Sequence, residues 1–163
     1  CDIDREFYLS LLIDRNNSQL MMMLSSSGGM DIEEVAKHSP DKIYNIHFPD
    51  HSNVELPSSL QKKLDINIDQ FNQLGQISDK LVKAFLSLDA TTIEINPLVL
   101  NSEGKFILLD AKISIDDNAL FRHPELEELK DLSEEDPLEL EASQSDMNYI
   151  KLKGYVKSID YRL

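Results

Sequence analysis

The chain has 163 residues, with 41% hydrophobic and 28% charged residues, which predicts one globular domain with a hydrophobic core. The formal net charge of −14 argues against nucleic acid as a partner. An apolar run of membrane-spanning length and a signal peptide are both lacking, and the single cysteine excludes an internal disulfide and fits a reducing compartment.

The first 50 residues predict a long β-hairpin, a short helix and a further strand. Residues 6–13 and 19–25 are expected to be two strands joined by a turn at residues 14–18. After a loop, Asp31 is expected to cap a helix that ends near His38, with Glu34 at the capping-box position. Residues 42–48 then predict another strand. The chain starts at Cys1 without an initiator Met, which fits a fragment.

The clearest helix runs from about residue 69 to residue 88, because apolar side chains recur there at helical spacing. Gly75 weakens this helix by about 1 kcal/mol relative to Ala, so the sequence predicts close packing around that glycine. A hairpin follows over residues 93–113. Beyond it, Pro137 is expected to open a helix that extends to about residue 147, and residues 149–152 read as extended. Together these elements predict an α+β fold, an antiparallel sheet covered by helices.

The hairpin over residues 93–113 has a register that its own turn sets. Gly104 suits the left-handed position of a three-residue loop at residues 102–104. Pairing outward from that loop places Asn96 opposite Asp110 and Glu94 opposite Lys112. Strict alternation along both arms then predicts two faces. The core face would carry Ile93, Ile95, Val99, Ile107, Leu109, Ala111 and Ile113, and the other face would carry Leu98, Leu100, Phe106 and Leu108 beside the four polar residues.

Asn96 and Asp110 are the candidate metal ligands. Residues directly opposed in a hairpin have Cβ atoms roughly 4.5–5.5 Å apart, so one amide oxygen and one carboxylate can share a hard cation. Asp110 ends an apolar strand, which predicts a buried carboxylate that needs a cation or hydrogen-bond donors. The simpler alternative is that these polar pairs are solvated and that Glu94 forms a plain ion pair with Lys112.

Two other groups of residues invite a functional interpretation. The sequence assigns no catalytic histidine, because His38, His47 and His51 lack a cysteine or carboxylate at metal-ligand spacing. Residues 125–141 carry nine acidic side chains against one lysine. A solvated acidic face is the simpler interpretation of that segment, and a docking surface is the alternative.

Three runs of sequence carry a family resemblance. They are EINPL at residues 94–98, LDAK at 109–112 and DDNALFRHP at 116–124, and REFYL at 5–9 and EEDP at 134–137 support them. Together they resemble the β subunit of succinyl-CoA synthetase (succinate–CoA ligase, ADP- or GDP-forming). That subunit has an ATP-grasp domain followed by a CoA-ligase domain. The resemblance implies that residues 1–154 are the C-terminal part of an ATP-grasp domain, an ATP-grasp lobe, and that residues 155–163 are a divergent or truncated tail.

The resemblance also implies ligands and partners. In this family the positions of Asn96 and Asp110 bind Mg²⁺, the same pair that the hairpin register brings together, and Glu94 and Lys112 would support them. The implied cofactors are Mg²⁺ and a nucleotide, ATP/ADP or GTP/GDP. The implied partner is the α subunit of the synthetase, in a heterodimer or heterotetramer. The expected location is the cytoplasm of a bacterium or the mitochondrial matrix of a eukaryote.

The sequence departs from the family pattern at two positions. Ser27 stands where the family usually has an acidic residue beside Gly28 and Gly29, and Tyr155 replaces an Asn that contacts substrate. The family's phosphate-binding lysine and glycine-rich loop would lie upstream of Cys1. The chain alone is therefore expected to be inactive.

The expected function is to supply the Mg-nucleotide half-site for phosphoryl transfer coupled to the interconversion of succinyl-CoA and succinate in the tricarboxylic acid cycle. One alternative is the ATP-grasp lobe of a related acid–CoA ligase, such as a malate–CoA ligase. The other is a non-enzymatic binding or assembly module. At this stage the acid substrate, the nucleotide base and the oligomeric state stay open.

Overall fold

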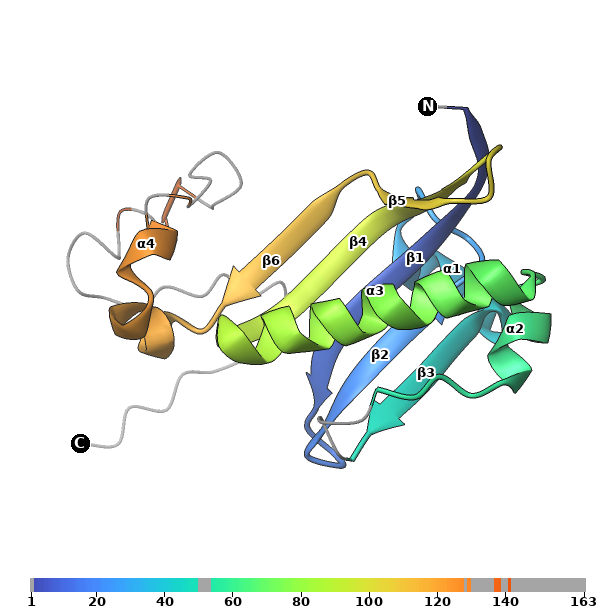
Figure 1. Ribbon diagram of the computed structural model, residues 1–163. Coiled ribbons are helices and arrows are strands. Elements are labelled where there is room, and N and C mark those ends of the chain that lie inside the picture. The colour runs from blue at the N-terminus through green and yellow to red at the C-terminus, as the bar shows by residue number, and fades with distance from the viewer. Residues whose placement is uncertain (1, 50–53, 128, 130–136, 139–140, 142–163) are drawn as a thin grey trace, which may run out of the picture. The chain divides into compact units, whose positions relative to one another are not determined.

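The centre of the molecule is an antiparallel β-sheet. In the computed structural model, which describes residues 2–49, 54–127, 129, 137–138 and 141, six strands of the described chain form this sheet in the order β3-β2-β1-β4-β5, with β6 also paired to β4 (Figure 1). Its strands are β1 (Ile3–Asp14), β2 (Gln19–Ser25), β3 (Ile43–Phe48), β4 (Ala90–Asn101), β5 (Phe106–Leu108) and β6 (Ala111–Ile115). The predicted α+β class is confirmed.

The first hairpin forms as the sequence predicts. β1 and β2 pair from Tyr8 opposite Ser25 to Asp14 opposite Gln19. Asp14 closes the turn, since its carboxylate accepts hydrogen bonds from the main-chain N–H of Asn16 at 2.9 Å and from the side chain of Asn17 at 2.7 Å. β1 begins earlier than expected because its first residues pair with the far end of β4.

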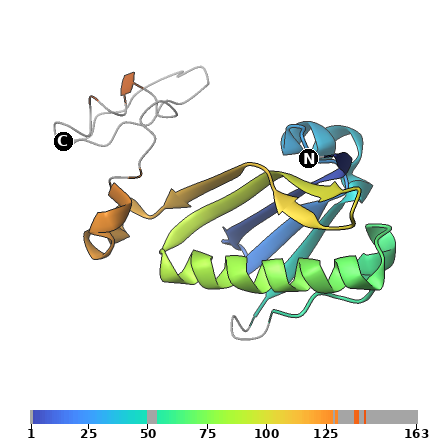
Figure 2. The same ribbon diagram turned by 45° about the horizontal axis from the view of Figure 1, so that its top comes forward.

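Two helices lie on opposite sides of the sheet (Figure 2). The shorter is α1 (Ile32–His38), and the longer is α3 (Ile68–Ser87). Asp31 caps α1 by accepting a hydrogen bond from the main-chain N–H of Glu33 at 2.8 Å. The predicted capping box is wrong, because the Glu34 carboxylate contacts Lys37 at 2.8 Å and His38 at 3.4 Å instead. Neighbouring side chains on the same helix compete for that carboxylate.

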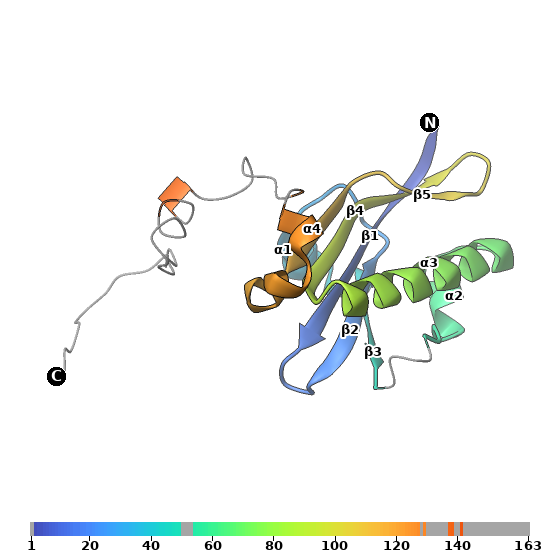
Figure 3. The ribbon, with the colours of Figure 1, turned by 60° about the vertical axis from the view of Figure 1, so that its left-hand side comes forward.

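Helix α3 forms because its sequence supplies both a start signal and an apolar face. Asn67 and Gln70 make a reciprocal capping box, with each side chain 2.9 Å from the main-chain nitrogen of the other residue. The face toward the sheet buries four side chains, Leu74, Ser78, Val82 and Phe85. Figure 3 shows α3 running across the strands, with α2 (Ser59–Lys63) beside its start. The predicted helix over residues 69–88 is confirmed to within one residue at each end.

A bulge in β4 changes which side chains reach the core. Phe7 pairs with Leu98 and Leu9 pairs with Ile95, so Asn96 and Pro97 together stand against the single residue Tyr8. The extra residue shifts the alternation by one position. Ile93 and Ile95 before the bulge and Leu98 and Leu100 after it therefore all belong to one buried core cluster.

The two faces predicted from strict alternation are therefore wrong. Leu98 and Leu100 were expected on the face away from Ile93 and Ile95, yet they share the core with them. Phe106, from the same expected face, packs its ring on Phe7 with centroids 5.6 Å apart. On the predicted core face, three residues of β6 and the connection before it are exposed instead of buried: Leu109, Ala111 and Ile113.

The C-terminal part of the chain is a separate unit. The chain divides into two compact units, Cys1–His123 and Pro124–Leu163. The first unit ends with η2 (Asp117–Arg122), and the second starts with α4 (Pro124–Glu127). Residues 137, 138 and 141 are helical, and the rest of the predicted helix and the extended segment at 149–152 lie outside the described residues. Within the described part, the helices are too short or too polar to cross a membrane.

Candidate metal site

The hairpin of β4, β5 and β6 has the predicted register. Leu98 pairs with Leu108, Leu100 with Phe106 and Glu94 with Lys112. Gly104 adopts a φ of 76°, the left-handed conformation that its place in the turn requires. The turn is further fixed by Asn101, whose side-chain oxygen accepts hydrogen bonds from the main-chain N–H groups of Glu103 at 3.1 Å and Lys105 at 2.8 Å.

Asn96 and Asp110 lie opposite each other in this register. The main-chain N–H of Asn96 donates a hydrogen bond to the main-chain oxygen of Asp110 at 3.3 Å. The Asp110 side chain is exposed, so the expectation of a buried carboxylate is wrong. The reason is that Asp110 lies in the connection between β5 and β6 and not within a strand. Leu109, the residue before it, is exposed as well. Among the residues that the structure describes, the Asp110 carboxylate has neither a hydrogen bond nor an ion pair.

This donor set suits a hard cation. An amide oxygen and a carboxylate are the oxygen ligands that Mg²⁺ prefers, and Mg²⁺ is commonly held by one or two protein ligands plus phosphates and water. The free Asp110 carboxylate is available for such a role. The part of the chain that the structure describes, this hairpin included, contains no cluster of three or more His, Cys, Asp or Glu side chains that could hold a metal. Asn96 and Asp110 are therefore a candidate pair of protein ligands, with the other coordination positions open to phosphate or water.

The side chain of Asn96 also holds a loop that the sequence did not connect with it. Its Oδ1 accepts a hydrogen bond from the main-chain N–H of Gly29 at 2.8 Å, and its Nδ2 donates to the main-chain oxygen of Met30 at 3.1 Å. The paired glycines at 28 and 29 were the available signal for a close approach of two main chains. The sequence could not show what they approach.

Tyr8 and Glu94 lie on the same side of the sheet as this loop. Tyr8 alternates with Phe7 and Leu9, which are in the core, so its side chain is on the face away from α3. Burial raises the pKa of the Tyr8 hydroxyl above its usual 10.0, and the charges of Glu94 and Asp31 raise this pKa further. The Ser10 side chain, which lies next to the hydroxyl, lowers this pKa in part, so the hydroxyl is in a polar environment on the face that carries Asn96.

The histidines described by the structure each contact a carboxylate. His47 Nε2 lies 2.9 Å from Asp14 Oδ2, and His123 Nε2 lies 2.7 Å from Asp89 Oδ2. Sequence spacing did not reveal these pairs, because each joins segments more than thirty positions apart. Both pairs connect ends of secondary-structure elements, and neither is part of the Asn96 region. His51 lies outside the described residues.

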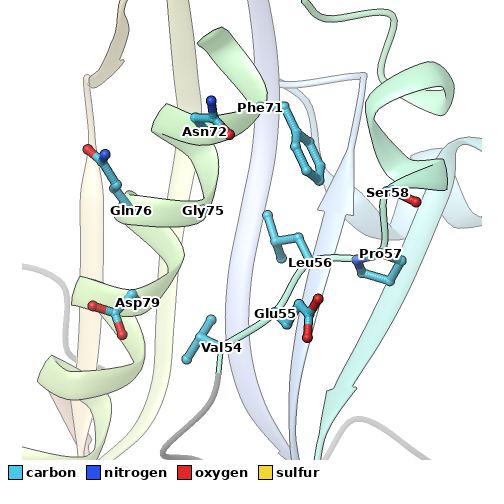
Figure 4. Close-up of a pocket in the computed structure, with 10 residues that line it drawn as sticks. All are labelled: Val54, Glu55, Leu56, Pro57, Ser58, Phe71, Asn72, Gly75, Gln76 and Asp79. Atoms are coloured by element: carbon cyan, nitrogen blue, oxygen red, sulfur yellow. The ribbon is translucent and has the colours of Figure 1, made fainter. Parts of the chain in front are cut away.

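A hollow of about 910 Å³ lies between α3 and the segment that precedes α2 (Figure 4). It is lined by Val54, Glu55, Leu56, Pro57, Ser58, Phe71, Asn72, Gly75, Gln76 and Asp79. A Cβ added to Gly75 would meet no atom within 4 Å, so the predicted close packing at this glycine is wrong. Gly75 borders open space because the neighbouring segment does not reach the helix surface there. The hollow lies on the α3 side of the sheet, away from the loop that Asn96 holds.

The antiparallel sheet crossed by one long helix belongs to a known class of protein domain. A family profile described as "ATP-grasp domain" matches residues 1–100, and the chain belongs to that family. The matched region contains Asn96 and ends before Asp110.

Among curated proteins, the chain is similar to one kind of enzyme subunit. The chain is 44% identical over 158 residues to the β subunit of ADP-forming succinate–CoA ligase from Acidiphilium cryptum, covering 96% of this chain and 40% of that protein. It is 46% identical over 157 residues to the same subunit from a Hydrogenobaculum species, covering 94% of this chain and 40% of the relative. The chain thus spans about two fifths of the length of these relatives.

The fold also matches a solved structure. An ATP citrate lyase from Methanothrix soehngenii, in complex with citrate and coenzyme A, superposes with a TM-score of 0.59 and 18% identity, covering 90% of this chain and 34% of that one. At this identity the likeness shows the fold alone.

Proposed function

We propose that this chain supplies the Mg-nucleotide half-site of a succinate–CoA ligase. The observation that carries the proposal is the pairing of Asn96 with Asp110 across the hairpin. The chain that contains this hairpin is similar to β subunits of ADP-forming succinate–CoA ligases. Such a ligase would make a nucleoside triphosphate from succinyl-CoA, phosphate and a nucleoside diphosphate, ADP or GDP. A second, α subunit would complete the enzyme, because the relatives are named as β subunits.

The share of this chain in the reaction would be electrostatic. Asn96 Oδ1 and the Asp110 carboxylate would hold Mg²⁺, which when bound supplies positive charge to the phosphate oxygens during phosphoryl transfer. The two side chains would fix the place of that charge, with Asn96 carried by β4 and Asp110 by the short connection between β5 and β6. Tyr8 and Glu94 lie on the same face and would shape the polar wall of the site. The remaining coordination positions would be left to phosphate oxygens and water.

The experiment is a coupled assay on the complete β subunit containing these residues, expressed with its α subunit. Mg²⁺, CoA, ATP and either succinate or malate are supplied, and acyl-CoA formation is followed by the release of ADP. Succinyl-CoA formation that is lost in Asn96→Ala would support the proposal. Activity with malate alone would assign a different acid–CoA ligase, and inactivity with both acids and with GTP in place of ATP would leave a binding or assembly module.

A further inference from the structure

The loop at residues 28–30 holds the amide of Asn96 in one orientation. The Gly29 N–H requires an oxygen acceptor and the Met30 carbonyl requires an N–H donor, and the Asn96 amide meets both at 2.8 and 3.1 Å. The two contacts agree on which atom is Oδ1, so the amide cannot be flipped without losing both. A carbonyl oxygen has two lone pairs, so Oδ1 keeps one for a cation after accepting from Gly29.

The loop is itself pressed against β1. The main-chain N–H of Gly28 donates to the main-chain oxygen of Glu6 at 3.1 Å. A Cβ on Gly28 would overlap main-chain atoms of Phe7, which is paired with Leu98 of β4 and cannot move aside as the end of a flexible side chain can. Gly29 has a φ of +68°, and a Cβ there would lie 2.8 Å from Oε2 of Glu6. Glycine at both positions is what lets the loop approach β1 closely enough to reach Asn96.

We propose that residues 28–30 position Asn96 as a metal ligand, so that the close approach of this glycine loop to β1 sets the metal affinity of the hairpin. This inference rests on the proposed function. Groups that hydrogen-bond to a metal ligand restrict its orientation, and losing them commonly costs about 10–100-fold in metal affinity. The glycine loop thereby acts on the metal through Asn96, and Gly28 and Gly29 are positioning residues.

The experiment measures metal affinity and loop position in the same variants of the complete β subunit. Mn²⁺ is the probe, and free Mn²⁺ is followed by its electron paramagnetic resonance signal in the presence of ADP. Hydrogen exchange of the peptide spanning residues 26–31 reports whether the loop has moved. Gly28→Ala displaces the loop by a main-chain clash, and Gly29→Ala meets only the flexible end of Glu6 and perturbs it less.

Gly104→Ala is the matched control. Gly104 also has a positive φ, +76°, so it carries a backbone strain like that at Gly29, but it lies at the tip of the hairpin and its Cβ would meet only Gln70 at 3.6 Å. We expect Mn²⁺ affinity to fall about 10–100-fold in Gly28→Ala and less in Gly29→Ala. Gly104→Ala should stay within about threefold of the wild type, because it leaves the contacts of Asn96 intact.

The outcomes separate this inference from the proposed function. If Asn96→Ala leaves Mn²⁺ affinity unchanged, the metal assignment itself fails. If Asn96→Ala weakens binding but a displaced loop in Gly28→Ala or Gly29→Ala does not, the metal assignment stands and the positioning role is refuted. A loss in Gly104→Ala as large as that in Gly28→Ala would also refute it, since a general effect of replacing a glycine would then explain both.

Discussion

Gly29 and Asn96 are 67 positions apart in the chain, yet the main-chain N–H of Gly29 donates a hydrogen bond to Oδ1 of Asn96 at 2.8 Å. The contact ties the loop after β2 to the middle of β4, two strands away in the sheet. It occurs at the β4 bulge, where Asn96 and Pro97 stand against Tyr8 and Leu98 returns to the core side. Bulges commonly occur beside functional sites, and here the bulge contains the candidate metal ligand Asn96 and returns Leu98 to the core.

The packing of α3 on the sheet should dominate the stability of the first unit. Leu74 is 1% exposed and belongs to the core cluster, so Leu74→Ala should lower the free energy of unfolding by about 2–5 kcal/mol. The control is Leu86→Ala on the same helix, where the side chain is 46% exposed and the loss should be far smaller. Urea denaturation followed by circular dichroism measures both. Equal losses would mean that α3 does not pack as described.

The open space beside Gly75 predicts a stabilising substitution. Gly75→Ala adds a methyl group where no atom lies within 4 Å, and alanine loses less backbone freedom than glycine when a helix forms. We expect the free energy of unfolding to rise by about 0.5–1 kcal/mol. Thermal denaturation should then show a higher melting temperature than the wild type. A lower one would indicate that another part of the protein fills the hollow beside this glycine.

The turn of the first hairpin should respond to acid. Hydrogen bonds from Asn17 and His47 lower the pKa of Asp14 from 3.8 to about 2. A carboxyl whose pKa is lowered by folding stabilises the folded state above its ordinary pKa, and this contribution is lost as the pH falls from about 4 to about 2. In Asn17→Ala the Asp14 titration, followed by the carboxyl carbon resonance, should move to higher pH. Asn72→Ala, on α3, should leave that titration in place.

The hairpin was predictable from sequence because one glycine fixes its register. Gly104 determines the turn, and the pairing of Glu94 with Lys112 follows by counting outward. Which side chains face the core was not predictable. Nothing in the sequence around residues 96 and 97 shows that these two residues of β4 stand against the single residue Tyr8 of β1. Contacts such as Asn96 with Gly29 depend on how distant strands are ordered in the sheet, and periodicity along one strand carries no information about that order.

The metal assignment can be tested by comparing two aspartates near the hairpin in the complete enzyme. Asp110→Asn keeps the shape of the side chain and removes the full negative charge from the proposed Mg²⁺ ligands. Asp116→Asn is the control, because Asp116 caps η2 by accepting a hydrogen bond from the main-chain N–H of Asn118 at 2.9 Å, a role that Asn also fills. Asp110→Asn should therefore lose far more activity, and the loss of one electrostatic contact to a transition state commonly costs about 10²–10³-fold.

The dependence of activity on the Mg²⁺ concentration is a second way to compare Asp110→Asn with Asp116→Asn. Since the Asp110 carboxylate is exposed and makes no ion pair among the described residues, its substitution should not disturb folding. The defect should lie in metal binding, so raising the Mg²⁺ concentration should partly restore the rate of Asp110→Asn and should leave that of Asp116→Asn unchanged. Steady-state kinetics of both variants across a Mg²⁺ titration measure this. Near-normal activity of Asp110→Asn at low Mg²⁺ would leave the hairpin a structural element only.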